Sequence, residues 1–455
     1  MSLDLTKGNP TKLLIQFMLP MLFSSVFQQF YNIADTFVVG RYIGPSALAA
    51  VGTTGNITSM VLILLQGATS GISVVVAQIF GSGNHSRLRQ SVALSAMLVA
   101  VLTLSLGAIG ATLTPPLLKL INVPADVLPD ATAYMRIVLL GSLASGFYNL
   151  ASSLLRSMGD SVTPLVLLIV SSMLNLGLNI LFVTAFHLGV PGVAYATVLA
   201  SAISAVACIV YGWRKRPVLR FGRSDMKWDW SMVKTIMKIG LPASLMSATI
   251  NIGMIMIQTL VNGYGTVVMA GYALGLKMEH IFNGLGFTAA NAMSVFSAQN
   301  VGAGDYDRVH KGFKSSLTIS MSIIAVLSPI MVIFGRSILN WFTNDGADVV
   351  TVAYRYTLMI ALSVPFVLVL ITTRNTMHGA GDAMIPFIMG VFELVSRFLC
   401  AYFLSIAWGY VGVFLGTPLA WISGAIFGAI RYRSGKWKNK RIQVEAETAE
   451  TAEAE

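Results

Sequence analysis

The sequence predicts an all-α integral membrane protein, with twelve transmembrane helices in two pseudo-symmetric six-helix lobes around a central cavity. Composition is the first indication, because 55% of the 455 residues are hydrophobic and only 11% are charged, whereas a soluble domain carries about a quarter charged residues. The second is a series of twelve apolar runs, and the third is a repeat relating the first six runs to the last six. This composition excludes a water-soluble enzyme and a nucleic-acid-binding protein, although Lys and Arg exceed Asp and Glu by 11.

Each apolar run is long enough to cross a bilayer, for which a helix needs about 20 residues. Clusters of charged and turn-forming residues separate the runs, and an isolated charge inside a run does not end it. The first six runs cover residues 12–38, 47–79, 91–113, 131–155, 164–186 and 192–213. The last six cover residues 233–262, 267–299, 312–335, 350–375, 386–406 and 411–431.

The runs divide the chain into four parts. Spans 1–6 form an N-lobe of residues 1–213, and spans 7–12 form a C-lobe of residues 233–433. The long polar connection between them, residues 214–232, is interpreted as a cytoplasmic linker. Residues 434–455 are first basic and then acidic, a composition that predicts a disordered tail on the cytoplasmic side.

The positions of the basic residues predict the orientation. With an even number of spans both termini lie on one side, and cytoplasmic loops carry an excess of Lys and Arg. Most of the 30 Lys and Arg residues fall in the termini and the even-numbered connections. We therefore expect a multi-pass protein of the cell (inner) membrane with both termini in the cytoplasm.

An internal duplication connects the two halves. The segment Gln78–Gly83, with the pattern Gln-x-x-Gly-x-Gly, recurs at Gln299–Gly304, 221 residues later. Nearly the same shift relates further pairs, which are Pro20 and Pro242, Gly44 and Gly265, Gly159-Asp160 and Gly381-Asp382, Pro164 and Pro386, and Gly192 and Gly412. Two parallel six-span halves are typical of a transporter that rocks around a path between its lobes.

The glycine-rich motifs do not indicate a nucleotide site. Gln-x-x-Gly-x-Gly follows a membrane span here, not a strand, and the chain contains no P-loop with its Lys and Ser or Thr. We therefore expect no nucleotide and no cofactor, and transport energy from an ion gradient.

Four polar residues of the N-lobe form a candidate cation site. Asp35 lies in the first run without a basic residue within a helical turn, and an unpaired carboxylate in a membrane is stable when it is protonated or holds a cation. Asn175 and Asn179 share one face of the fifth run, and Thr197 lies at a similar depth in the sixth. Their oxygens suit sodium. Alternatively, Asp35 lies in water at the outer interface, and the Asn and Thr groups join helices.

The C-lobe carries a second polar set. Glu393 and Arg397 are four residues apart and can pair on one helix face, and Glu279 can meet Arg397 while Lys277 meets Glu393. This set either neutralises itself as a structural network or exposes a carboxylate that attracts cationic substrates. Met254 and Met256 offer an adaptable apolar surface or are ordinary packing residues.

With these motifs together, the chain resembles multidrug and toxic compound extrusion (MATE) family antiporters over about residues 10–435. The segments that carry the resemblance are Asn32–Asp35, Gly81–Gly83, Gly302–Gly304, and Gly159-Asp160 with Pro164. The resemblance implies a bacterial-type efflux protein that exchanges sodium ions or protons for amphipathic, often cationic, organic compounds.

The resemblance also implies a cation site at Asp35, Asn175 and Thr197. Asn179 stands where that branch of the family often has Asp, which removes one charge from a sodium site, so a proton on Asp35 is the alternative coupling species. Glu279 best matches the acidic C-lobe residues of related branches.

Two other functions remain as alternatives. A lipid-linked precursor flippase of related fold favours a strongly cationic cavity, for which only Lys277 and Arg397 were found within the spans. An intramembrane enzyme needs a cluster of His or carboxylate groups, which the five His residues do not provide. We expect a monomer in contact with membrane lipid, with small organic cations and amphipathic drugs as ligands.

Overall fold

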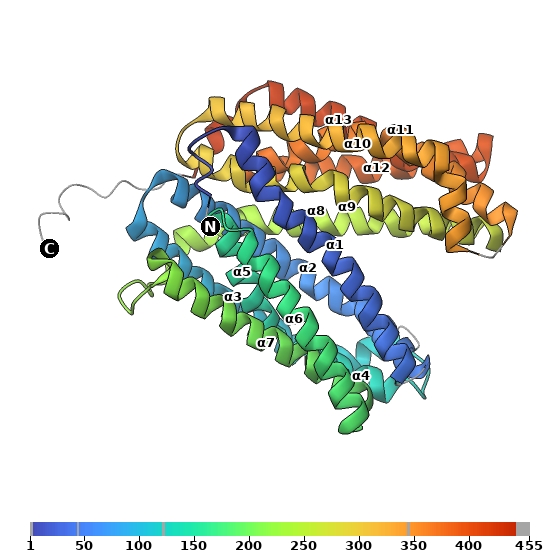
Figure 1. The fold of residues 1–455 in the computed structure, drawn as a ribbon, viewed down its shortest axis with the longest axis horizontal. Helices are drawn as coiled ribbons and strands as arrows, with labels where there is room; N and C mark the ends of the chain where they lie inside the picture. The colour runs from blue at the N-terminus through green and yellow to red at the C-terminus, as the bar shows by residue number, and fades with distance from the viewer. Residues whose placement is uncertain (1–2, 43–44, 121–122, 344–345, 443–455) are drawn as a thin grey trace, which may run out of the picture.

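The computed structural model describes residues 3–42, 45–120, 123–343 and 346–442, which fold into helices that follow the twelve apolar runs in order (Figure 1). The N-lobe contains α1 (Pro10–Tyr42), α2 (Pro45–Ser82), α3 (His85–Leu120), α4 (Leu128–Leu140), α5 (Ser142–Ser157), α6 (Val162–Ile180) with the π-helical turn η1 (Leu181–Ala185), and α7 (Gly189–Lys215). The C-lobe contains α8 (Trp230–Asn262), α9 (Thr266–Gly302), α10 (Tyr306–Phe342), α11 (Ala347–Gly379), α12 (Met384–Trp408) and α13 (Tyr410–Arg433).

Within the described ranges, ten helices are long and apolar enough to cross a membrane, and α4 with α5, bent by 45°, makes an eleventh span. The twelfth is α9, the 37-residue helix that carries Lys277 and Glu279. All twelve predicted spans therefore correspond to helical units. Several helices extend beyond the predicted bounds, as α10 does at both ends.

The linker between the lobes is shorter than predicted. α7 continues to Lys215 and α8 begins at Trp230, so residues 216–229 connect them through a short 3-10 helix, η2 (Pro217–Leu219). The start of α8 is fixed by Asp229, whose carboxylate accepts the backbone N–H groups of Ser231 and Met232.

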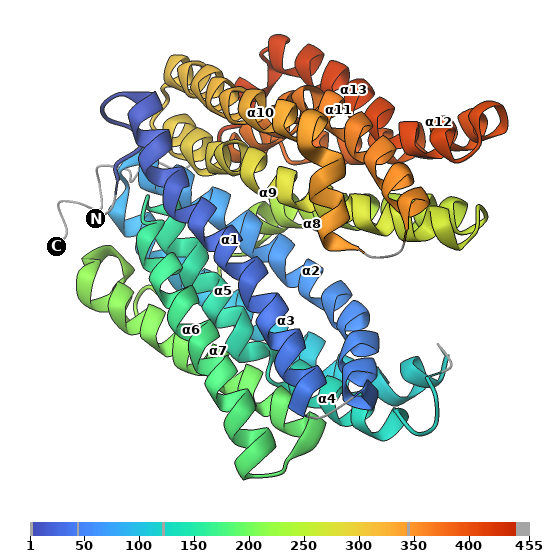
Figure 2. The ribbon, with the colours of Figure 1, turned by 45° about the vertical axis from the view of Figure 1, so that its right-hand side comes forward.

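The two lobes meet at one end of the molecule and diverge towards the other (Figures 1 and 2). Both ends of the described chain lie where the lobes meet, and we call this region the closed end. At the junction α2 packs against α8 and α9 of the opposite lobe.

Glycines allow α2 to approach α8 at backbone distance. A Cβ atom added to Gly71 would lie 2.5 Å from the carbonyl oxygen of Ile236, and one added to Gly240 would lie 2.6 Å from that of Gly67. Real Cβ atoms do not reach such distances, so only Gly fits at these crossings.

The duplicated Gln-x-x-Gly-x-Gly motifs meet at the closed end. A Cβ atom on Gly81 would lie 1.9 Å from the Gln299 carbonyl oxygen, and one on Gly302 would lie 2.0 Å from that of Gln78. The two copies of the motif thus form a symmetric crossing of α2 and α9. Their second glycines, Gly83 and Gly304, have φ of 77° and 81° and turn the chain into the next helix.

The first and last described segments pack into the closed end. The Leu5 N–H donates to Gln299 Oε1 at 3.1 Å, and the Ile442 N–H donates to Gln78 Oε1 at 3.0 Å. Residues 436–440 form the 3-10 helix η3 (Lys436–Lys440), in which Trp437 is only 2% exposed. The prediction of disorder is therefore wrong for residues 434–442, because Trp437 and the contact to Gln78 order them; residues 443–455 lie outside the described ranges.

Candidate cation and substrate sites

The predicted N-lobe cluster is assembled by three helices. Asn179 Nδ2 on α6 donates to Asp35 Oδ1 on α1 at 2.7 Å and to Asn175 Oδ1, one turn away, at 3.1 Å. Asn175 Nδ2 donates to Thr197 Oγ1 on α7 at 3.3 Å. The four residues predicted from the sequence thus form one continuous hydrogen-bonded chain.

The structure adds two tyrosines to this cluster. The Tyr31 hydroxyl donates to Asn175 Oδ1 at 2.7 Å, and Tyr134 of α4 lies close to Asp35. Tyr31 precedes Asp35 by four residues, so its place on the same helix face could have been read from the sequence. Tyr134 carries no comparable signal, because only the packing of α4 against α2, α3 and α7 places it here.

The cluster offers buried oxygen atoms to a small cation. Asn175 is 3% exposed and Asn179 is fully buried. Among the described residues, Asn179 Oδ1 has no hydrogen-bond partner. A buried, unpartnered carbonyl oxygen is costly, and beside a carboxylate it suits a hard cation. The donor set of one carboxylate, two amides and a hydroxyl therefore fits either a proton on Asp35 or a bound sodium ion.

The C-lobe holds a buried ion-pair triad. Glu393 receives Arg374 Nη2 at 2.6 Å and Arg397 Nη2 at 2.7 Å, and each of the three side chains is at most 8% exposed. The predicted pairing of Glu393 with Arg397 is present. The predicted meeting of Lys277 with Glu393 is wrong, because Glu393 is already held by two arginines and Lys277 is exposed.

Glu279 lies apart from this triad. Its carboxylate accepts hydrogen bonds from the Tyr356 hydroxyl and from Asn283 Nδ2, the latter at 3.2 Å. Arg397 acts on it electrostatically, but no ion pair joins the two in the described part of the chain, because Arg397 is bound to Glu393. Glu279 is 6% exposed, so its carboxyl group faces the inside of the C-lobe.

Arg374 connects two cavities. One, of about 110 Å³, lies inside the C-lobe and is lined by Met254, Glu279, Arg374 and Arg397 among others. The other, of about 200 Å³, lies between the lobes and is lined by Gln66 and Ser70 of α2 and by Met246, Arg374 and His378. Sequence reasoning missed Arg374, which stands at the end of the tenth apolar run, because helix ends cannot be located to within a turn.

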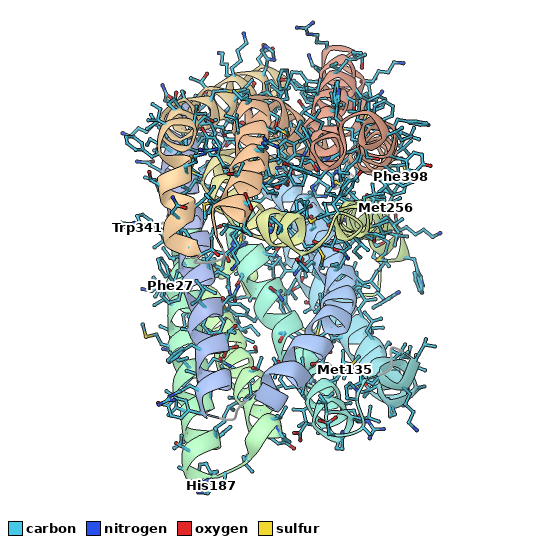
Figure 3. All side chains as sticks on the ribbon, turned by 90° about the vertical axis from the view of Figure 1, so that its right-hand side faces the viewer. Phe27, Met135, His187, Met256, Trp341 and Phe398 are labelled. Carbon is cyan, nitrogen blue, oxygen red and sulfur yellow. The ribbon has the colours of Figure 1, made fainter. Side chains whose placement is uncertain are left out.

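The two methionines of the prediction differ in position. Met254 lines the C-lobe cavity and is 37% exposed. Met256 is half-buried on the same helix and does not line the cavities described above. In Figure 3, which views the molecule from the end opposite the closed end, the C-lobe lies above the N-lobe and Met256 is labelled on α8.

The comparison with protein families agrees with the duplication. The MatE family model matches residues 20–181 and again residues 242–403, so the second match begins 222 residues after the first. This is the shift found between Pro20 and Pro242 in the sequence. Each lobe is one copy of the family unit.

Individual relatives cover nearly the whole chain. The chain is 28% identical over 447 residues to "Probable multidrug resistance protein YpnP" of Bacillus subtilis (strain 168), covering 97% of this chain and 99% of that protein. It is 24% identical to "Probable multidrug resistance protein NorM" of Thermotoga maritima, covering 95% and 94%. Among solved structures, "Crystal structure of MATE in the bent conformation" has the same fold, with a TM-score of 0.88 at 22% identity and coverage of 96% and 98%. The chain therefore belongs to the MatE family of membrane transporters, and it is not an enzyme.

Proposed function

We propose that this protein is a cation-coupled antiporter that exports amphipathic, often cationic, organic compounds. The observation that carries the proposal is the Asp35–Asn179 hydrogen bond beside the unpartnered Asn179 Oδ1, deep among helices α1, α6 and α7. The names of the relatives as multidrug resistance proteins support the substrate class. An ionisable group in this environment is a coupling site by the general rule for intramembrane charges.

A proton and a sodium ion fit the cluster in different ways. A proton on Asp35 Oδ2 would neutralise the carboxylate without moving its neighbours, because Asn179 Nδ2 continues to donate to Oδ1. A sodium ion would use Asp35, Asn179 Oδ1 and Thr197 Oγ1, and it would need Asn175 Oδ1 to release one of the two donors that it now accepts. Protonation needs only one free oxygen of Asp35 and no rearrangement of the amides, so the geometry of the cluster favours the proton.

The exchange would proceed by rocking of the two lobes. The side of the closed end carries most Lys and Arg residues and both termini, and we propose that it faces the cytoplasm of the cell that holds the protein in its inner membrane. The lobes then diverge towards the outside. Opening to the cytoplasm requires the contacts of Gln78 and Gln299 to break, while the helices within each lobe move together. Each monomer contains both lobes and so a complete path.

The C-lobe cavity is proposed to receive the apolar and cationic parts of the substrate. Met254 and the aromatic residues around Tyr356 provide apolar surface, and Glu279 provides a negative charge that no described cation pairs. The arginines do not oppose a cation as strongly as their number suggests, because both are bound to Glu393.

The lipid-precursor flippase is the second candidate. Arg374 adds a third intramembrane base to those expected, which favours it, but the charges of Glu279, Arg374, Glu393 and Arg397 sum to zero. A pyrophosphate needs a cationic cavity, so we retain the export of cations.

The test is transport by the full chain in proteoliposomes with separately imposed sodium and proton gradients. Uptake or release of a fluorescent organic cation that follows one gradient and not the other names the coupling ion. Equal rates with no gradient, with either gradient and with protein-free vesicles would overturn coupled transport.

A further inference from the structure

A polar cavity of about 480 Å³ lies at the closed end, beside the C-terminal segment. Its lining comes from both lobes. Arg87 lies in the first turn of α3 in the N-lobe, Lys238 lies on α8, and Asp382 precedes α12, while Lys440 and Arg441 lie just before the last described residue. The mechanism proposed above uses none of these side chains.

The two carboxylates that line the cavity are already neutralised. Asp229 pairs with Arg87 at 2.8 Å, and Asp382 pairs with Arg431 at 2.7 Å. Partial burial raises the pKa of Asp229, but the Met232 N–H and the Arg87 guanidinium outweigh this effect and lower the pKa below its usual value. Asp229 is therefore an ionised partner of Arg87 near neutral pH, and it does not compensate the other cations.

Three cations of the lining are not paired with any described carboxylate. Within the described ranges, Lys238, Lys440 and Arg441 form no ion pair, and Arg441 only donates to the Gly302 carbonyl oxygen at 2.7 Å. The first turn of α12 also faces this cavity through Ala383 and Met384, and no side chain caps it. A helix start adds positive potential to that of the three cations.

We propose that this cavity binds a phosphate-bearing anion. Arg and Lys donors on several sides, with a helix start between them, match the many acceptor oxygens and the charge of a phosphate group. The volume accommodates one or two phosphate groups with water. The anion is either a soluble phosphate compound or the headgroup of an anionic lipid, because basic pockets between membrane helices bind such headgroups at the cytoplasmic surface.

The position of the cavity gives binding a structural consequence. Lys440 and Arg441 belong to the segment that ends at Ile442 on Gln78 of the N-lobe, and Lys238 belongs to the C-lobe. An anion that contacts them all would bind across the lobe junction and stabilise the closed end. Binding can be measured in the absence of the coupling ion and of the exported compound.

The experiment measures binding to the full chain in neutral detergent at about 0.15 M salt, where weak surface attraction is screened. Inorganic pyrophosphate is titrated by calorimetry, and thermal unfolding is followed in the same samples. A second arm uses nanodiscs of phosphatidylcholine with or without phosphatidic acid. The test variant is K238Q/K440Q. The control is K234Q/K436Q, which changes the same net charge on the same two helices at exposed lysines outside the cavity.

We expect the wild type and the control to bind with equal affinity and K238Q/K440Q to bind at least tenfold more weakly. Binding of pyrophosphate identifies a soluble phosphate compound, and stabilisation by phosphatidic acid alone identifies a lipid headgroup. The proposal is overturned if neither probe binds, or if both double variants lose binding to the same extent. All four lysines are exposed, and unfolding without ligand verifies that each variant is folded.

Discussion

Gln78 and Gln299 occupy equivalent positions in the two halves, and each binds the end of a helix in the opposite lobe. Gln78 Nε2 donates to the Gly379 carbonyl oxygen of α11 at 2.8 Å, and Gln299 Nε2 donates to the Ser157 carbonyl oxygen of α5 at 2.7 Å. Each amide oxygen accepts a backbone N–H from one end of the chain. The repeated glutamines therefore join four segments, and they hold the lobes together where the described chain begins and ends.

Removing both glutamines is expected to open the closed end. Gln78→Ala with Gln299→Ala removes the partners of three buried backbone groups, at about 1–3 kcal/mol each, and of the part-buried Ile442 N–H. Spin labels at His85→Cys and Lys311→Cys, in a chain with Cys208 and Cys400 replaced by Ser, report the distance between the lobes. We expect a second, longer distance to appear.

The control for this experiment is Gln258→Ala, whose side chain reaches only Asn262 on its own helix. It should leave the distance distribution unchanged. An unchanged distribution in the double glutamine variant as well would show that the glutamines do not hold the lobes together.

Gly302→Ala should act on the same junction through sterics. The added methyl group would lie 2.0 Å from the Gln78 carbonyl oxygen, a backbone atom that cannot turn away. Gly284→Ala on the same helix is the matched control, because nothing lies within 4 Å of its Cβ position. Thermal unfolding in detergent should show a lower midpoint for Gly302→Ala and an equal or higher one for Gly284→Ala, since Ala favours a helix by up to about 1 kcal/mol. Equal midpoints would contradict the close crossing.

The ion pair of Glu393 should be costly to break. Glu393→Gln leaves Arg374 and Arg397 buried without a counter-charge, and breaking a buried pair costs about 3–5 kcal/mol. Lys277→Gln, at the exposed lysine, should change stability by less than about 0.5 kcal/mol. Denaturant unfolding compares the two variants with the wild type. Similar, small effects would show that Glu393 is solvated and not the centre of a triad.

Asp229 should contribute stability that is lost in acid. Because its pKa is lower in the folded chain than in the unfolded one, its contribution is full above the ordinary Asp value of about 3.9 and disappears as the pH falls through the lower folded value. Asp229→Asn keeps an oxygen for the start of α8 but cannot titrate. The difference in unfolding midpoint between wild type and variant should shrink between about pH 5 and pH 3. A difference that stays constant over this range would contradict the assignment.

Sequence reasoning reached the spans and the members of the N-lobe cluster from local properties, although the Asp35–Asn179 contact itself joins residues 144 apart. Apolar runs define helices wherever they lie, and Asn175 and Asn179 share a face through helix geometry alone. Arg374 and Tyr134 could not be placed, because their contacts depend on how helices pack: Arg374 meets Glu393 of the next helix, and Tyr134 lies close to Asp35 of α1. The repeated Gln-x-x-Gly-x-Gly motif was recognised, but its contacts across the lobes depend on how two complete bundles pack. The same reason explains why the packed segment around Trp437 was expected to be disordered.

The central claim is that Asp35 couples ion entry to export, and Asp35→Asn tests it most directly. The variant replaces one carboxylate oxygen by an NH2 group, and the resulting amide has nearly the same shape. The cluster therefore keeps its size, but residue 35 can neither exchange a proton nor supply a charge to sodium. The measurement is efflux of a fluorescent organic cation from proteoliposomes under the gradient that drives the wild type, with Asp126→Asn, an exposed carboxylate between α3 and α4, as the control. The account predicts that the gradient-driven rate of Asp35→Asn is at least tenfold lower than that of the wild type, and that the control has the wild-type rate. A wild-type rate with unchanged ion dependence in Asp35→Asn would contradict it.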